Sequence, residues 1–506
     1  MKKTSFCLLF LIASQLSAQK QDYNWIMGFD HAGDAGAQLW LMDWKNDTLE
    51  REQITLPYSY FHNNASISDA DGNLLIASNG CAVFNRNYEI MPSGDSLNWD
   101  QTYRELLRRE DCNVGYPGAQ QLSILPDPKN ENGYYIIHKT FVVANGSRQI
   151  TSELRSSYVD MELDDGYGDL TYKDEPLFVD EPSEQHLQAM RHSNGKDWWI
   201  LQPVDHDSTL LTMLIDEQGI TVQPQQDLGF FMEDSRFGSG TSRFSPDGNY
   251  YALFDYFYNL HLYDFDRATG KISNHQYIKL FESENLPDPD FKFGSVEWSS
   301  NSRFVYVAVI DSLMQVDTWE ENVQDGVRLI DTYIPPVTGF PNSFYIMALA
   351  PDCKIYLCSG SSSTAVHVIH EPNNLGEDCN FVQEGLRFPE NVGGVFPLHP
   401  RFRVDEEEKC NPNITSVFGE LVYWRRDLTI YPNPASEIVT VQIPESLQGY
   451  LVVMDMNGQI VYHKDKVRQD QSLDVSFLEP GVYSVEYVPE QNKDRIIYTT
   501  KMVVID

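Results

Sequence analysis

A repeated pattern of a polar turn followed by an apolar run divides most of the chain. The copies are ISDADGNLLIAS from Ile67, NENGYYIIHK from Asn130, HSNGKDWWILQ from His192, FSPDGNYYALF from Phe244, SSNSRFVYVAV from Ser299 and APDCKIYLC from Ala350. The turn positions are 61, 62, 53, 55 and 51 residues apart, counted at Gly72, Gly133, Gly195, Gly248, Arg303 and Lys354. This period is typical of four-stranded propeller blades with long loops.

The apolar runs need cover on both faces. A strand packed on one face alternates apolar and polar residues, but residues 134–137 and 304–309 are apolar throughout. Propeller blades stack face to face and so cover their middle strands without helices. The pattern predicts one short helix, over residues 102–111. A doubly wound α/β fold is therefore disfavoured, because it needs a helix between successive strands.

The ends of the repeat region predict a further blade. The run GGVFPLHPRFRV, residues 393–404, has no repeat partner downstream, and the N-terminal runs NWIMGFD and AQLWLMDW have none upstream. Joining these ends in one composite blade would close the ring and remove open sheet edges. We expect an all-β fold with a β-propeller of about seven blades, with six or eight as the alternatives.

A second β pattern follows the charged stretch DEEEKCNPN, which begins at Asp405. Its strands are short, with turns every 8 to 12 residues, and Asn457-Gly458 is a strong two-residue hairpin signal. This pattern predicts a small immunoglobulin-like β-sandwich.

The first residues have the order of a secretory signal peptide. Lys2 and Lys3 precede an apolar run over residues 6–13 and the small residues before Gln19, so we expect cleavage after Ala18. No stretch reaches the roughly 18 uncharged apolar residues that a membrane-spanning helix needs, so we expect no transmembrane segment. The expected domains are a signal peptide (1–18), the propeller (19–410), a linker (411–426) and the sandwich (427–506).

The C-terminal segment resembles the type A C-terminal sorting domain of the type IX secretion (Por secretion) system of Bacteroidetes. The matching runs are YPNPA from Tyr431, DMNGQ from Asp455, LEPGVY from Leu478 and KMVV from Lys501. The resemblance implies export to the cell surface or the medium, with the secretion machinery as a partner. It also implies a sorting motif made of Tyr431, Pro432, Asn433, Pro434, Gly481 and Tyr483. An ordinary sandwich domain used for binding is the alternative.

The repeat region resembles the uncharacterised secreted Bacteroidetes propellers that carry this sorting domain. The likeness rests on ISDADGNLLIASNGC, IMPSGDSLN, NGKDWWIL and LAPDCKIYLC, whereas FSPDGNYYALF and LYDFDRATGKIS resemble WD40-like and lactonase-like repeats. These runs are blade signatures. They imply a fold and an address, and they carry no catalytic residue to this chain.

The charge of the chain limits its partners. It has 37 basic and 74 acidic side chains, a net charge of −37, which disfavours a nucleic-acid partner. Asp30, His31 and Asp34 are metal-ligand types on one glycine-rich loop, but three ligands within five residues rarely complete a site. We expect no cofactor; calcium is the cation that so acidic an exported chain would suit, although no Asp-x-Asp-x-Asp-Gly loop occurs.

The cysteines predict disulfides. Cys7 lies in the signal peptide, and the six others form an even count in an exported chain, which favours disulfides over metal ligation. Proximity in the sequence and loop context predict the pairs Cys81–Cys112 and Cys379–Cys410, although six cysteines allow 15 connectivities.

The sequence assigns no catalytic residue. Asp69, Asp71 and Asp247 fall in blade turns, where Asp caps its own backbone, and no serine-nucleophile or zinc motif occurs. His138 is interpreted as a packing residue, and at least one ring of Trp198-Trp199 as core. The leading hypothesis is a binding or interaction module for an unknown protein or glycan ligand. The alternatives are a carbohydrate-active hydrolase or lyase with paired carboxylates in the channel, and a structural component of the cell envelope.

Overall fold

The computed structural model forms two compact units, residues 1–416 and 417–506. It describes residues 19–506 except 29–38, 55, 57–58, 61–62, 101–102, 105–114, 145–147, 234–238, 282–293, 310, 334–342, 360–362, 417–423, 444–448, 456–459, 490–495 and 506. The expected signal peptide, the Asp30–His31–Asp34 group and most of the expected helix over 102–111 lie outside the described residues.

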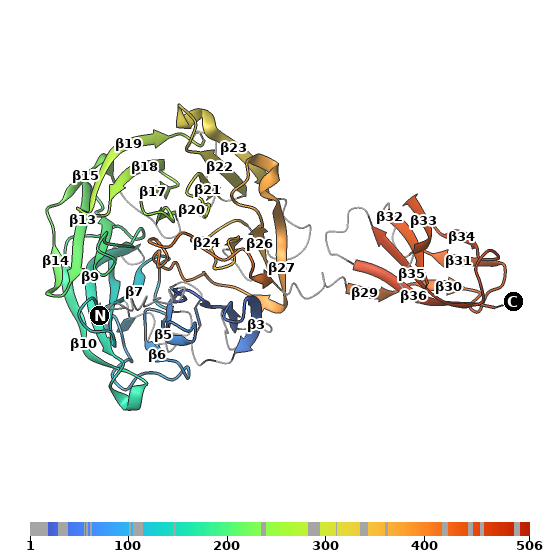
Figure 1. The fold of residues 1–506 in the computed structure, drawn as a ribbon, viewed down its shortest axis with the longest axis horizontal. Coiled ribbons are helices and arrows are strands. Elements are labelled where there is room, and N and C mark those ends of the chain that lie inside the picture. The colour runs from blue at the N-terminus through green and yellow to red at the C-terminus, as the bar shows by residue number, and fades with distance from the viewer. Residues whose placement is uncertain are drawn as a thin grey trace, which may run out of the picture. The chain divides into compact units, whose positions relative to one another are not determined.

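In the described part of the first unit, seven sheets form a ring, the predicted β-propeller (Figure 1). The closing sheet joins both ends of the unit, in the order β1 (Asn24–Gly28), β2 (Leu39–Asp43), β3 (Thr48–Ile54) and β28 (Thr415–Ser416). The next sheets contain β4 (Ala65–Ser68), β5 (Leu74–Ser78) and β6 (Val83–Asn85), then β7 (Leu122–Pro126), β8 (Gly133–Ala144), β9 (Arg148–Asp160) and β10 (Asp169–Phe178), then β11 (Gln188–Arg191), β12 (Trp198–Pro203), β13 (Asp207–Asp216), β14 (Gly219–Val222) and β15 (Gln226–Met232). The last three contain β16 (Gly240–Phe244), β17 (Tyr250–Asp255), β18 (Asn259–Asp266) and β19 (Lys271–Ile278), then β20 (Gly294–Trp298), β21 (Phe304–Val309), β22 (Ser312–Asp317) and β23 (Val327–Thr332), then β24 (Met347–Leu349), β25 (Ile355–Leu357), β26 (Ser363–Ile369) and β27 (Phe381–Val392).

Burial explains the apolar runs. β21 pairs with β20 and β22 and is buried at every residue, as its uninterrupted apolar run predicted. The outermost strand β19 is mostly exposed and carries polar side chains. The blades therefore cover one another's middle strands, which is why this unit needs no helical layers.

Tight turns join the first two strands of the blades. Gly72, Gly195 and Gly248 have φ of 84°, 75° and 73°, a conformation that favours glycine. Asp69 Oδ1 accepts hydrogen bonds from the backbone N–H of Asp71 (3.0 Å) and Asn73 (2.9 Å), which is the predicted capping role. Turns of adjacent blades lie together on one side of the ring, which we call the turn face. The opposite side, with the connections between blades, is the loop face.

The expected strand over residues 393–404 does not form, because Pro397 and Pro400 lack the N–H that a ladder needs. The segment instead lies along the inner side of β1. Val395 O accepts a hydrogen bond from Asn64 Nδ2 (2.8 Å), and the rings of Phe396 and Trp25 lie 5.2 Å apart. The closing blade takes its last strand from β28, which pairs with β3 in parallel.

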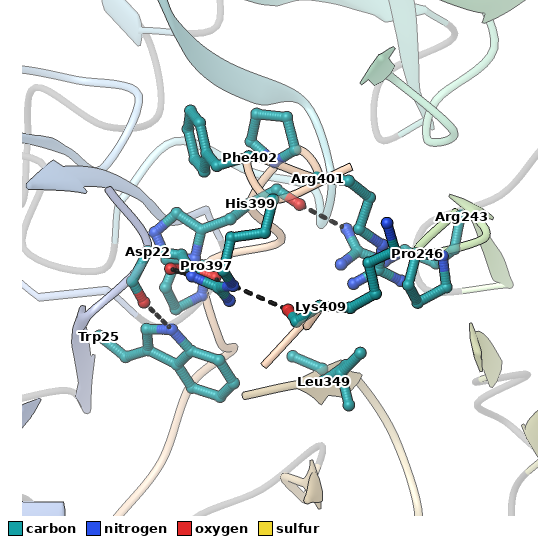
Figure 2. A pocket seen from close by; sticks show the side chains of 13 residues that line it. Asp22, Trp25, Arg243, Pro246, Leu349, Pro397, His399, Arg401, Phe402 and Lys409 are labelled. Atoms are coloured by element: carbon teal, nitrogen blue, oxygen red, sulfur yellow. Dashed lines mark hydrogen bonds and ion pairs between the residues drawn. The ribbon is translucent and has the colours of Figure 1, made fainter. Parts of the chain in front are cut away.

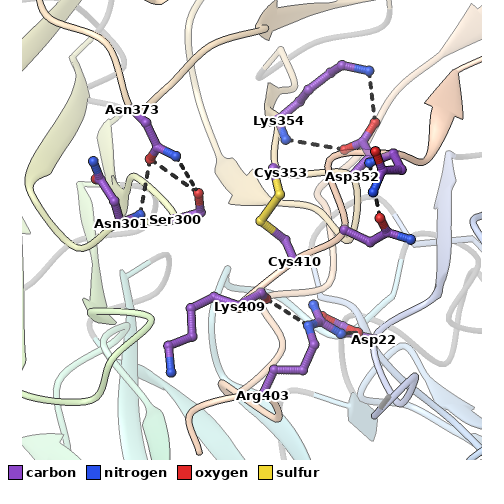
Figure 3. Close-up of a disulfide and its surroundings, with 12 residues drawn as sticks. Asp22, Ser300, Asn301, Asp352, Cys353, Lys354, Asn373, Arg403, Lys409 and Cys410 are labelled. Carbon is purple, nitrogen blue, oxygen red and sulfur yellow. Dashed lines mark hydrogen bonds and ion pairs between the residues drawn. A yellow bond between two sulfur atoms is a disulfide. The ribbon is translucent and has the colours of Figure 1, made fainter. Parts of the chain in front are cut away.

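One disulfide prediction is wrong. Cys410 bonds to Cys353, with a Cα–Cα distance of 5.2 Å (Figure 3), and Cys379 is a buried free thiol. Cys379 ends the 3₁₀ turn Gly376–Cys379 and packs in an apolar cluster, whereas Cys353 lies in the turn where the chain after Cys410 docks, with Asn411 N donating to Pro351 O (2.7 Å). Cys81 is disulfide-bonded, but Cys112 lies outside the described residues, so that pair stays a prediction.

The second unit is a two-sheet sandwich. One sheet contains β29 (Trp424–Asp427), β36 (Ile496–Val504), β35 (Gly481–Pro489), β32 (Gly449–Met454) and β33 (Ile460–Val467), in this order. The other contains β30 (Thr429–Tyr431), β31 (Ile438–Gln442) and β34 (Gln471–Asp474). Side chains from both sheets form one apolar core, which includes Val439, Leu451, Val485 and Tyr487.

Candidate functional site

The chain's own residues 393–410, which we call the central segment, occupy the middle of the ring. His399 Nε2 lies 3.2 Å from Ser66 Oγ on β4, and His399 O accepts a hydrogen bond from Arg243 Nη1 on β16 (3.0 Å). The Phe402 ring meets the Trp198 ring of β12 at 5.7 Å. The segment therefore contacts several blades at once and fills the space where a propeller channel would run.

Glu297 on β20 is the acidic group of this centre. Its carboxylate accepts hydrogen bonds from the backbone N–H of Trp298 (2.7 Å) and Leu349 (2.9 Å), from Arg243 Nε (3.1 Å) and from Arg401 Nη2. Burial alone would raise the pKa of Glu297, but Arg243 and Arg401, with the backbone hydrogen bonds from Leu349 and Trp298, outweigh it and hold the pKa below its ordinary value. The carboxylate is therefore ionised and saturated with donors.

A second ion pair holds the segment to the N-terminal end of the unit. Arg403 donates from both terminal nitrogens to Asp22, at 2.6 and 2.5 Å, and from Nη1 to Gln19 O (2.9 Å). Its Nε donates to Lys409 O (2.7 Å), beside the disulfide (Figure 3). Together these bonds and the disulfide connect the two ends of the propeller chain.

A pocket opens at this centre, on the turn face. Figure 2 shows Arg243, Pro246 and Arg401 on one side, Asp22, Trp25 and Pro397 on the other, and Leu349 below. Cations and apolar rings thus line the same space.

A buried lysine holds the connection between two blades toward the loop face. Lys139 Nζ donates to Ser183 O (2.9 Å), Gln185 O (2.9 Å) and Gln202 Oε1 (3.1 Å), and burial lowers its pKa to about 7. All its donors are used within the protein, so its role is to fix this connection.

The other candidates from the sequence are structural. Asp247 accepts hydrogen bonds from Ser245 Oγ (2.6 Å) and the Asn249 N–H (3.1 Å), as a turn residue does. His138 lies between Asn98 Oδ1 (2.6 Å) and Ser157 Oγ (3.0 Å), and both Trp198 and Trp199 are buried. Within the described ranges, no three His, Cys, Asp or Glu side chains come together to hold a metal ion.

The predicted sorting motif surrounds the last strand of the sandwich. Asn433 Nδ2 donates to Lys501 O (2.8 Å) and Asn433 Oδ1 accepts from the Val503 N–H (2.8 Å), so one amide ties the YPNPA loop to β36. Tyr431 is 52% exposed, while Tyr483 is buried and donates to Glu479 O (2.7 Å). Gly481 begins β35, and Pro432 and Pro434 flank Asn433 in the loop.

Comparison with known proteins decides what this unit is. Residues 429–505 match the family model described as the secretion system C-terminal sorting domain. The C-terminal unit is a sorting domain of this family. The sorting domain indicates export to the cell surface or outside the cell, through the type IX machinery. No helix among the residues described above has the length and apolar character to cross a membrane.

The chain is also similar to solved structures, at low sequence identity. A protein from Lactobacillus plantarum is 13% identical, covers 74% of this chain and 99% of its own, with a TM-score of 0.41. PorZ, a surface component of the type IX secretion system of Porphyromonas gingivalis, is 12% identical, with 94% and 69% coverage and a TM-score of 0.27. A putative 6-phosphogluconolactonase from Bacteroides fragilis is 12% identical, with 62% and 94% coverage and a TM-score of 0.27. At these scores the likeness carries no argument about function. No curated protein matches the chain.

Sequence reasoning missed the charged centre, although a signal was present. Met190, Arg243, Glu297 and Ala348 lie on successive innermost strands, each two residues before the first residue of the turn that follows. Two of the four are charged, with opposite signs, at a position that the ring buries. Buried charges are paired in folded proteins, so this contrast pointed to an ion pair between adjacent blades.

Proposed function

We propose that this protein is an exported propeller that acts as a binding or interaction module for a protein or glycan at the cell surface or outside the cell. The sorting domain supports the export step. The observation that carries the binding role is the filled centre of the ring, where Arg401 and Arg403 of the central segment pair with the carboxylates of Glu297 and Asp22. The rim and the two faces then remain as the surfaces that can meet a partner.

The central carboxylates do not support the alternative of a channel glycosidase. A general acid in such an enzyme needs a raised pKa, and its partner must be free to act as a nucleophile or base. The pKa of Glu297 is lowered instead, and both oxygens of Asp22 accept hydrogen bonds from Arg403. Their chemistry is that of structural ion pairs.

The loop face offers an exposed aromatic side chain for recognition. Trp99 is 41% exposed, and its ring lies 4.9 Å from that of Tyr103. The neighbouring Asn98 is fixed by Nδ2 donating to Gly80 O (3.1 Å), within the connection between β5 and β6. Exposed tryptophans on a rigid support are frequent anchors for glycans and proteins.

The test compares two exposed tryptophans on opposite faces. Purified mature protein would be screened against a glycan array and against purified outer-surface proteins, beside Trp99→Ala and Trp319→Ala. Trp319 is 68% exposed and stacks on Arg303 at the turn face, so it is the matched control. We expect a ligand whose binding Trp99→Ala weakens about tenfold and Trp319→Ala leaves unchanged. Turnover of a glycoside substrate by the same preparation, lost on Glu297→Gln, would refute the proposal.

A further inference from the structure

The turn-face pocket is lined by more cationic than anionic side chains, in a chain whose net charge is −37. Four of its side chains are cations: Arg243, Arg401, Arg403 and Lys409. Among the described residues, the carboxylates in ion pairs with these cations are Asp22, which pairs with Arg403, and Glu297, which Arg243 and Arg401 share; Asp247, Asp405 and Glu406 lie farther off, on the side of Lys409. Arg403 is thus neutralised, while two guanidinium groups divide one carboxylate and Lys409 has backbone acceptors, Val404 O and Glu406 O.

The shared arginines have donors to spare. Arg243 uses Nε for Glu297 and Nη1 for His399 O, and Arg401 uses Nε for Phe244 O (3.0 Å) and Nη2 for Glu297. Within the described part of the chain, Arg243 Nη2 and Arg401 Nη1 have no hydrogen-bond acceptor. Both side chains line the pocket, and their exposed fractions are only 2% and 10%. A guanidinium group so poorly solvated is stabilised by a counter-anion with oxygen acceptors.

We propose that this pocket binds a small organic carboxylate between Arg243 and Arg401, with Lys409 as the third cation. The planar guanidinium fork matches the two oxygens of a carboxylate. The remaining walls are Trp25, Leu349, Phe402 and the prolines Pro246, Pro397 and Pro400, which suit a short apolar body (Figure 2). A phosphate or sulfate ion has no apolar part to place against these walls, so the lining favours a carboxylate.

The experiment uses the full mature chain and butyrate as the probe. Thermal unfolding and isothermal titration calorimetry would compare sodium butyrate, sodium phosphate and sodium chloride at one ionic strength. We expect butyrate to raise the melting temperature, because a ligand that binds the native state stabilises it. Arg401→Gln leaves the buried Arg243–Glu297 pair neutral and is expected to weaken butyrate binding at least about tenfold.

The controls separate this site from a general charge effect. Arg303→Gln removes an arginine that is paired with Asp317 outside the pocket, and it is expected to bind butyrate as the unaltered protein does. If Arg401→Gln fails to fold, Lys409→Gln replaces it, with a severalfold weaker affinity expected from the loss of one cation. Absence of a butyrate effect, equal effects of butyrate and phosphate, or an undiminished effect in the pocket variants would each overturn the proposal.

Discussion

The propeller and the sorting domain bury different kinds of side chain. In the propeller, buried charged and polar groups include Arg243, Glu297, Lys139, His138 and His399. In the described part of the sorting domain, every buried side chain is apolar or a tyrosine. The blades of the ring meet at one centre. Ion pairs and hydrogen bonds are directional, so they fix how neighbouring blades are positioned there. A two-sheet sandwich needs only complementary apolar faces, because burial has no preferred direction.

The largest expected difference between the two units is in acid. Burial lowers the pKa of His138 and His261 to about 3 and that of His399 to about 4, and it also lowers the pKa of His186. Each is neutral when folded but gains a proton when unfolded below about pH 6.5, so stability is full above that pH and falls as pH drops toward the folded pKa. Each group contributes up to about 1.4 kcal/mol per pH unit in this window.

Calorimetry from pH 7.5 to pH 4.5 would check this. The propeller transition is expected to move down by more than the sorting-domain transition, because all four of these histidines lie in the propeller. Equal shifts of the two transitions would contradict the assignment of the acid sensitivity to buried histidines.

Breaking the central ion pairs should affect the propeller alone. Glu297→Gln leaves Arg243 and Arg401 buried without a carboxylate, which typically costs about 3–5 kcal/mol of unfolding free energy. Denaturant unfolding followed by tryptophan fluorescence measures it. Asp405→Asn is the control: it removes the half-exposed partner of Arg267, where the expected cost is at most about 1 kcal/mol. A similar loss of unfolding free energy in both variants would show that the central ion pairs do not stabilise the propeller more than a surface ion pair does.

The reverse test makes a cavity in the sorting domain. Leu451 is fully buried between β33 and β35, so Leu451→Ala is expected to cost about 2–5 kcal/mol of that domain's unfolding free energy. The propeller transition in calorimetry should stay in place. A shift of both transitions would mean that the two units unfold together. Their stabilities could then not be compared separately.

The smallest expected effect concerns the sorting loop. Asn433→Ala removes two hydrogen bonds to β36 at an exposed site, so we expect a loss of about 1 kcal/mol in the sorting domain. Export would be measured by immunoblotting cells and medium, with Asn413→Ala as an exposed asparagine outside the domain for comparison. Reduced export with Asn433→Ala at nearly unchanged stability would show that the machinery reads this loop. Unchanged export would assign Asn433 a structural role.

Local sequence patterns predicted the blades well because each blade repeats the same polar turn followed by an apolar strand. The turn at Asp69–Asn73 and the wholly apolar β21 follow from a few adjacent residues, and their conformations depend little on the rest of the chain. The sorting domain was recognisable for the same reason, since its motif residues lie in short runs such as YPNPA. In both cases the information is local.

The cysteine pairing and the central segment depended on distance in space. Cys379 is closer than Cys353 to Cys410 along the chain, yet the ring brings Cys353 beside it. Arg401 and Glu297 are 104 residues apart in sequence, and closure of the ring alone makes them partners. Two prolines prevent a β-ladder of hydrogen bonds in the central segment. The neighbouring sequence does not indicate which side chains of the ring the segment will contact.

The amino-acid order thus settles the strand period, the turns and the export address of this protein, because each depends on neighbouring residues. The folded ring settles which charges meet at its centre, which cysteines bond and where two arginines are left with unused donors. Those outcomes depend on seven blades closing on one axis, and a contact at that axis unites residues that no short stretch of chain contains.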